Sequence, residues 1–120
     1  SLPLPGMLAA RRVVVTGIGL VTPLGCGKLN VWKSLLQGQT GVESMDPFHP
    51  DIPISVAAKA KDIDIVDLFG KQSSRYRSRA THFALHASDM ALADAGFNEG
   101  AAIDLKRAGV AVASGMGSLE

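Results

Sequence analysis

Apolar residues fall at consecutive positions in two separate stretches of the chain, a pattern typical of strands buried on both faces. Val13, Val14 and Val15 are adjacent and β-branched, and the apolar character continues to Val21 past Thr16 and two glycines. Residues 109–114, read as GVAVAS, show the same character. Because successive side chains of a strand point to opposite faces, both stretches are predicted to be central strands covered by helices on each side.

Apolar residues at helical spacing predict two helices between these strands. A short amphipathic helix is expected over residues 28–37 and a longer one over residues 78–95. Gly38 and Gly96 follow directly and are expected to end them in the left-handed conformation. The apolar stripe of the longer helix is wide and rich in alanine, which indicates burial against more than one neighbour. Its members are Phe83, Ala84, Ala87, Met90, Ala91 and Ala95.

The stretches between these helices are less regular. Alternation with a period of two over residues 54–60 predicts a strand near a sheet edge, and residues 62–69 predict one or two helical turns. Glycine and three prolines predict a loop over residues 39–53, and residues 98–107 form a polar connection. The order strand, helix, strand, helix, strand favours an α/β fold with a mainly parallel sheet.

The composition narrows the class of protein. The chain has 120 residues, enough for one domain or part of one, and its net charge of +1 gives no general case for binding nucleic acid or membranes. No apolar run approaches the ~20 residues that span a bilayer. The single cysteine excludes an internal disulfide and fits a reducing compartment, such as the cytoplasm or a mitochondrial or plastid matrix. Residues 1–10 lack a basic segment, so they are interpreted as a disordered or processed leader rather than a secretory signal.

Residues 16–19, read as TGIG after a predicted strand, raise the alternative of a nucleotide-binding oxidoreductase. The dinucleotide fingerprint G-x-G-x-x-G needs a third glycine, where this chain has Thr22. It also needs a helix that opens at the phosphate, whereas Pro23 and two later glycines delay the helix. The fingerprint is therefore incomplete, and the alternative is kept as a weaker hypothesis.

Three side-chain sets could carry chemistry. His82 and His86 have metal-ligand spacing, but Phe83 stands where a zinc protease has glutamate, so hydrogen-bonded histidines and no metal are predicted. Cys26 precedes a helix, yet a small residue in a glycine-rich bend is its favoured role. A run of four cations forms either a solvated face or a surface for an anionic partner: Lys71, Arg75, Arg77 and Arg79.

Two motifs resemble those of a known family. Residues 11–25, RRVVVTGIGLVTPLG, and residues 32–41, WKSLLQGQTG, resemble the amino terminus of a β-ketoacyl-[acyl-carrier-protein] synthase. Residues 112–118, VASGMGS, are similar to a second motif of that family. The resemblance runs from about Arg11 to the end of the chain, so residues 11–120 are expected to form the incomplete, amino-terminal part of a synthase domain.

The resemblance implies a thiolase-like layered α-β-α-β-α fold and a condensing enzyme of fatty-acid or polyketide synthesis that needs no cofactor. The family's nucleophile lies in a Thr-Ala-Cys segment, which would lie beyond Glu120 together with its histidine partners. No catalytic residue is therefore assigned here, and this chain alone is expected to be inactive. A catalytically silent relative, such as a chain-length factor, is the alternative within the family.

The resemblance also implies site residues and partners. Met116 would border the acyl pocket, with plain core packing as the competing interpretation. Arg75 and Arg79 would dock the acidic acyl carrier protein; they are four apart, so they would share a face if the helix begins early enough. Acyl and malonyl thioesters would be the substrates, and the full-length protein would be a homodimer.

Overall fold

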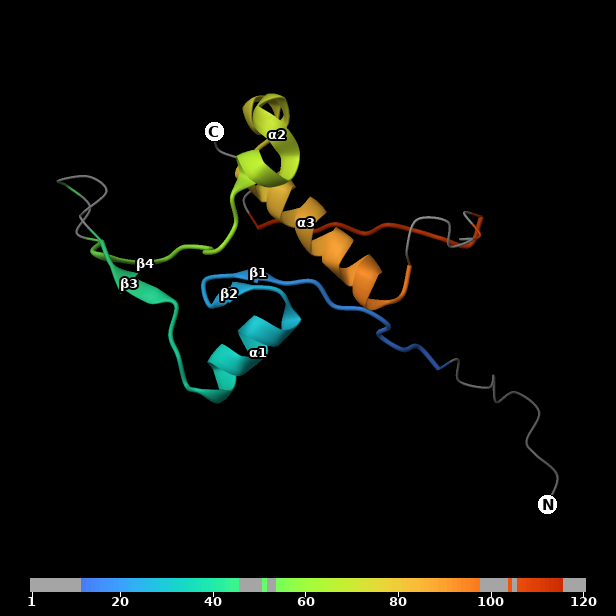
Figure 1. Ribbon diagram of the computed structural model, residues 1–120, viewed down its shortest axis with the longest axis horizontal. Helices are drawn as coiled ribbons and strands as arrows, with labels where there is room; N and C mark the ends of the chain where they lie inside the picture. The colour runs from blue at the N-terminus through green and yellow to red at the C-terminus, as the bar shows by residue number, and fades with distance from the viewer. Residues whose placement is uncertain (1–11, 46–50, 52–53, 98–103, 105, 116–120) are drawn as a thin grey trace, which may run out of the picture.

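The computed structural model describes residues 12–45, 51, 54–97, 104 and 106–115. The first half of the chain holds β1 (Val21–Thr22), β2 (Gly25–Cys26), α1 (Lys28–Leu36) and β3 (Val42–Ser44). The second half holds β4 (Val56–Ala58), α2 (Ile65–Tyr76) and α3 (Arg79–Asp94). The long helix α3 runs through the middle, with the β1–β2 hairpin and α1 on one side and α2 at its start (Figure 1).

Helices α1 and α3 confirm the two helices predicted from apolar spacing. Gly38 and Gly96 have φ angles of 64° and 78°, so both adopt the left-handed conformation that ends a helix. Helix α3 begins at a serine cap, because the Ser78 side chain accepts a hydrogen bond from the backbone N–H of Thr81.

Helix α2 extends well past the one or two turns predicted over residues 62–69. Its amino terminus is capped by Asp64, whose side chain accepts from the N–H groups of Val66 and Asp67. Gly70 has φ 77° and ψ 160° inside the helix, so the chain kinks there before a second, polar half. The second half has no apolar periodicity that would predict a helix from the sequence. The kink at Gly70 also interrupts the apolar spacing of the first half.

The strands form two small antiparallel sheets. Strand β1 pairs with β2, and β3 pairs with β4 in the register Val42 with Ala58. Strand β4 confirms the edge strand predicted within residues 54–60. Strand β3 was missed, because the surrounding prolines made residues 39–53 read as a loop.

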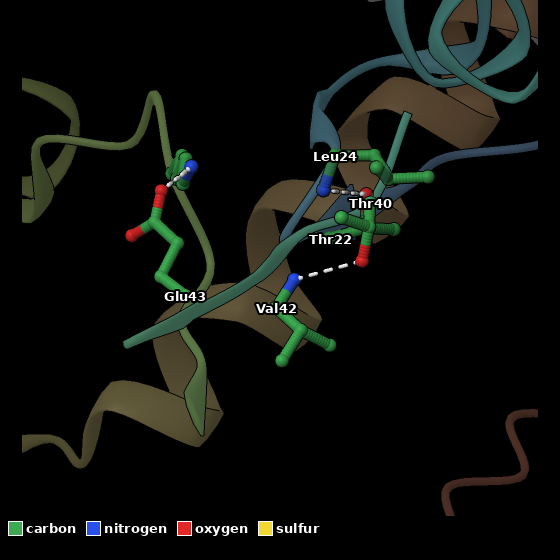
Figure 2. A network of polar contacts seen from close by, with 6 residues as sticks. Thr22, Leu24, Thr40, Val42 and Glu43 are labelled. Carbon is green, nitrogen blue, oxygen red and sulfur yellow. Dashed lines mark hydrogen bonds and ion pairs between the residues drawn. The ribbon is translucent and has the colours of Figure 1, made fainter. Parts of the chain in front are cut away.

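Threonine hydroxyls close the two turns next to these strands (Figure 2). The Oγ1 atoms of Thr22 and Thr40 accept from the N–H groups of Leu24 and Val42, each at 3.2 Å. An ion pair between Glu43 and Lys61 then ties β3 to the segment after β4 (Figure 2).

The two predicted buried strands are not formed in the described part of the chain. Among the described residues, 12–20 and 106–115 form no strand, and Val13 and Val110 are each 92% exposed. A buried strand needs hydrogen-bonding neighbours and a layer on each face, and the described residues supply neither around these valines. Both segments pass close to α3 instead: Gly17 and Gly19 lie against its backbone, and the 110–114 segment borders a cavity with it. A parallel sheet is therefore not seen in the described part of the chain.

Little apolar surface is buried among the described residues. Val31 of α1 is the one large apolar side chain there that is buried, whereas Leu29, Trp32 and Leu36 of the same helix are exposed. Exposed apolar area on this scale is typical of a surface that packs against another part of a protein. No helix in the described ranges has both the length and the apolar character to cross a bilayer.

Candidate functional site

The four cations of the basic run lie around the junction of α2 and α3. We call Lys71, Arg75, Arg77 and Arg79 the basic surface. Arg77 has the extended angles φ −126° and ψ 142°, so α2 ends before it, and Ser78 caps α3 after it. Arg75 therefore belongs to α2 and Arg79 to α3. A shared helix face required one helix that begins before Arg75, and the extended chain at Arg77 shows that this condition is not met.

The Arg79 side chain contacts other residues of this chain. Its guanidinium lies over the Phe83 ring, 4.9 Å from the ring centroid, and its Nη2 atom donates to the carbonyl of Ala60 at 3.5 Å. The first contact is a cation–π interaction within α3, and the second reaches the segment after β4. Arg79 thus has a structural role as well as an exposed charge.

Arg75 presents its charge differently. It is exposed in the last turn of α2 and follows Lys71 by four residues, so the two cations share a helix face. The neighbouring Tyr76 ring is 82% exposed. A cavity of about 380 Å³ beside them is lined by Phe69, Gln72, Ser73, Tyr76 and Arg77. The α2 part of the basic surface therefore offers cations and an aromatic ring to a partner.

His82 joins α2 to α3 beneath this surface. It is 1% exposed, and its Nδ1 atom lies 2.9 Å from the carbonyl oxygen of Ser78, so Nδ1 carries the proton and donates. Its Nε2 atom lies 3.3 Å from the hydroxyl of Ser73, which also accepts from Arg77 at 3.3 Å. The Phe69 ring packs on the imidazole with centroids 4.9 Å apart.

This arrangement confirms His82 as a hydrogen-bonded histidine. His86 sits edge-on to Phe69 at 6.5 Å and does not join His82 in a ligand set. Within the described ranges, no group of three or more His, Cys, Asp or Glu side chains is placed to hold a metal ion.

Cys26 lies in the bend between Gly25 and Gly27 and packs on α3. Its Sγ atom is 3.9 Å from the sulfur of Met90. Burial raises the pKa of the Cys26 thiol, and the nearby negative charge of Asp62 raises it further. A nucleophilic cysteine needs a lowered pKa. The surroundings of Cys26 thus favour a packed thiol over a reactive one.

Gly17 and Gly19 lie directly against the backbone of α3. A Cβ atom built on Gly17 would be 2.0 Å from the carbonyl oxygen of Ala91, and one on Gly19 would be 1.8 Å from that of Ala87. These glycines are therefore required by helix contact, and α1 begins only after the β1–β2 hairpin. That geometry argues against the dinucleotide fingerprint, whose glycines face a phosphate.

The predicted pocket residue Met116 lies outside the described residues. The segment that leads toward it borders α3, and a cavity of about 510 Å³ lies between the two. Its lining includes Ala84 and Leu85 of α3 and Val110, Val112 and Ser114 of the segment.

Sequence reasoning missed one polar cluster. Asp94, the last residue of α3, pairs with Lys28 of α1 and accepts from the backbone N–H of Ile18. The available signal was the charge of each side chain at its helix end, since an anion at a helix carboxyl end and a cation at a helix amino end are both unfavourable locally.

Comparison with known proteins assigns the family. The family model described as "Beta-ketoacyl synthase, N-terminal domain" matches residues 10–120. The chain is 34% identical over 117 residues to 3-oxoacyl-[acyl-carrier-protein] synthase 2 of Vibrio harveyi, covering 94% of this chain and 27% of that protein. For the protein of the same name from Rhizobium meliloti, the identity is 35% over 118 residues, covering 92% and 28%.

A polyketide relative is also similar. The granaticin polyketide putative beta-ketoacyl synthase 1 of Streptomyces violaceoruber is 38% identical over 109 residues, covering 90% of this chain and 26% of that protein. The chain thus spans about a quarter of the length of the curated relatives it matches. This chain belongs to the β-ketoacyl synthase family, over its amino-terminal domain, which implies a thiolase-like α/β fold.

Proposed function

We propose that this chain is the amino-terminal part of a β-ketoacyl-[acyl-carrier-protein] synthase of fatty-acid or polyketide synthesis. The observation that carries the proposal is the family match over residues 10–120, together with relatives named as 3-oxoacyl-[acyl-carrier-protein] synthases. In the longer protein, residues 12–20 and 109–114 would join a mainly parallel sheet in a layered fold. The exposed valines and the exposed apolar face of α1 would then be covered.

The reaction would be a decarboxylative Claisen condensation. An acyl group would first move from its carrier thiol to a cysteine thiolate, forming a new thioester. Malonyl-carrier protein would lose CO₂, and the electron pair left behind would form the new carbon–carbon bond at the acyl carbonyl while the thiolate departs. The raised pKa of the Cys26 thiol argues against Cys26 as that nucleophile. The proposed nucleophile is instead the cysteine of a Thr-Ala-Cys segment beyond Glu120. The full-length protein would act as a homodimer.

The test is a condensation assay of the full-length protein with acyl- and malonyl-carrier protein, followed by mass spectrometry of the β-ketoacyl product. The Cys26→Ser variant serves as the control and should keep the activity. A full-length sequence without a Thr-Ala-Cys segment, combined with no product, would identify the silent relative instead.

We further propose that the basic surface docks the acyl carrier protein, with Arg75 as the main contact. Carrier proteins of this kind are acidic, and Arg75 and Lys71 point one exposed positive face of α2 toward solvent. Exposed charges mainly raise the rate of encounter and lose effect in salt. Arg79 contributes charge but is also tied to Phe83 and Ala60.

Arg75→Glu should therefore raise the KM for carrier-bound substrate by a few-fold, corresponding to about 1 kcal/mol or less for a rim contact. The rate with a short pantetheine thioester should not change, and the KM of the variant should depend less on salt. Arg79→Glu should raise the same KM and also lower the thermal midpoint, because it breaks two contacts. Lys33→Glu, an equal charge change on exposed α1, is the matched control. Equal losses on both substrates would show that Arg75 is structural.

We also propose that Met116 borders the acyl pocket of the full-length protein. Glycines on both sides leave room for its flexible side chain to swing away from a long acyl chain. Met116→Trp should cut the rate with long acyl primers far more than with short ones. An equal loss with both primers would place Met116 in ordinary core packing.

A further inference from the structure

Lys28 and Asp94 each sit at the unfavourable end of their own helix. Lys28 is the first residue of α1, where no acidic residue lies in the first turn. Asp94 is the last residue of α3, where no basic residue lies in the last turn. A helix amino terminus carries partial positive charge and a carboxyl terminus partial negative charge, so both side chains weaken the helix that holds them. Local structure therefore gives no reason for either charge.

The tertiary structure supplies the reason, because the two helix ends meet. One carboxylate oxygen of Asp94, Oδ1, accepts from the Lys28 ammonium group. The other, Oδ2, accepts from the backbone N–H of Ile18 at 3.0 Å. Both contacts lower the pKa of the Asp94 carboxyl, with the hydrogen bond from Lys28 as the larger cause. One side chain thus joins three segments that are far apart in the sequence.

The arrangement of the backbone agrees with these contacts. The segment that contains Ile18 passes between the first turn of α1 and the last turn of α3 (Figure 1). On either side of Ile18, Gly17 and Gly19 lie in close contact with the α3 backbone. The segment is therefore held to α3 by these backbone contacts and by the charge-assisted hydrogen bond of the Ile18 N–H.

Side-chain packing between α1 and α3 is incomplete at this point. A cavity of about 460 Å³ opens there, with Ile18, Leu29, Met90 and Ala93 among its walls, and Lys28 and Asp94 line it as well. The ion pair spans a gap that apolar atoms leave unfilled. Of the two partners, only Asp94 contacts both other segments.

We propose that Asp94 acts as a three-way clip, a conformational device that holds the 12–20 segment and the start of α1 onto the end of α3. Removing its carboxylate loosens both segments, whereas removing Lys28 loosens α1 alone, and the contacts of Gly17 and Gly19 with α3 remain in both cases. The proposal rests on the fold and not on the proposed activity. The unfavourable helix-end charges are the cost of a contact that only the correct tertiary arrangement can satisfy.

Amide hydrogen exchange of the full-length protein, read by mass spectrometry at residues 17–20 and 31–34, tests the clip, because the hydrogen-bonded amides of α1 begin at Val31. Asp94→Ala should speed exchange at Ile18 by roughly tenfold, the effect of losing one charge-assisted hydrogen bond, and should also speed exchange at residues 31–34 of α1. Lys28→Met should affect α1 and leave Ile18 close to the unchanged protein. Asp94→Asn keeps an oxygen acceptor, so Ile18 should be only slightly faster.

A charge swap makes the test specific. Lys28→Asp with Asp94→Lys restores an ion pair and places both charges at their favourable helix ends. Protection of α1 should return, but Ile18 should stay fast, because lysine has no acceptor. Asp89→Ala, an exposed acid on the same helix, is the matched control and should change neither region. Unchanged exchange at Ile18 in Asp94→Ala, or full protection of Ile18 in the swap, would overturn the proposal.

Discussion

Gly19→Ala is expected to destabilise the protein by about 3 kcal/mol, at the upper end of the usual cost of overpacking. A Cβ atom at this position would lie 1.8 Å from the carbonyl oxygen of Ala87 and 2.7 Å from its carbonyl carbon. Both are backbone atoms of α3, so no side chain can turn aside to make room. The segment would have to lift off the helix, and the nearby contact of Ile18 with Asp94 would be lost with it.

The measurement is the thermal midpoint of the full-length protein, followed by circular dichroism. Asp89→Ala provides the control, because Asp89 is an exposed polar residue of α3. It should stay within about 0.5 kcal/mol of the unchanged protein, as exposed substitutions usually do. A Gly19→Ala midpoint equal to that of Asp89→Ala would show that the segment does not rest on α3 as described.

These glycines also show how far the sequence predicted the fold. Helices α1 and α3 were predicted almost to the residue, because apolar spacing and a closing glycine are local signals. The buried strands over residues 13–21 and 109–114 rested on a different assumption, namely that partners cover both faces. The described residues do not contain those partners, so the valines are exposed. A consecutive apolar run shows which side chains favour burial. It does not show which other segments cover them.

The second half of α2 and strand β3 were not predicted from the sequence for another reason. Residues after Gly70 are polar, and the helix there is held by contacts with α3, which include the bond between Ser73 and His82. Strand β3 exists because it pairs with β4, and the paired residues are twelve or more positions apart in the sequence. Neither element has a local pattern, since tertiary contacts decide both.

The basic surface was predicted as a set of charges but not as a geometry. The four-residue spacing of Arg75 and Arg79 would place them on one face only in a continuous helix. Ser78 is the cap of α3 and has the non-helical angles φ −67° and ψ 157°, so no continuous helix can run through it. A serine three residues before the Thr81 amide was therefore a signal in the sequence that α2 and α3 are separate.

His82→Ala is the second change with a large expected effect, a loss of about 3 kcal/mol. The imidazole is almost wholly buried and packs against Phe69. Its two ring nitrogens bond the Ser78 carbonyl at the start of α3 and the Ser73 hydroxyl on α2. Alanine would leave a cavity between the two helices and remove both hydrogen bonds, so α2 should pack less firmly against α3.

Three variants separate the cavity from the hydrogen bonds when thermal midpoints are compared in the full-length protein. His86→Ala is the matched control, because His86 lies one turn further along α3, is half-buried and contacts Phe69 edge-on. Its loss should destabilise the protein by about 1 kcal/mol or less. His82→Asn can still donate to the Ser78 carbonyl, so its midpoint should lie between those of His82→Ala and the unchanged protein. In addition, His82→Ala should weaken carrier binding, because Arg75 lies on the half of α2 that His82 anchors. If His82→Ala costs no more than His86→Ala, then packing elsewhere fixes α2, and the basic surface does not depend on this histidine.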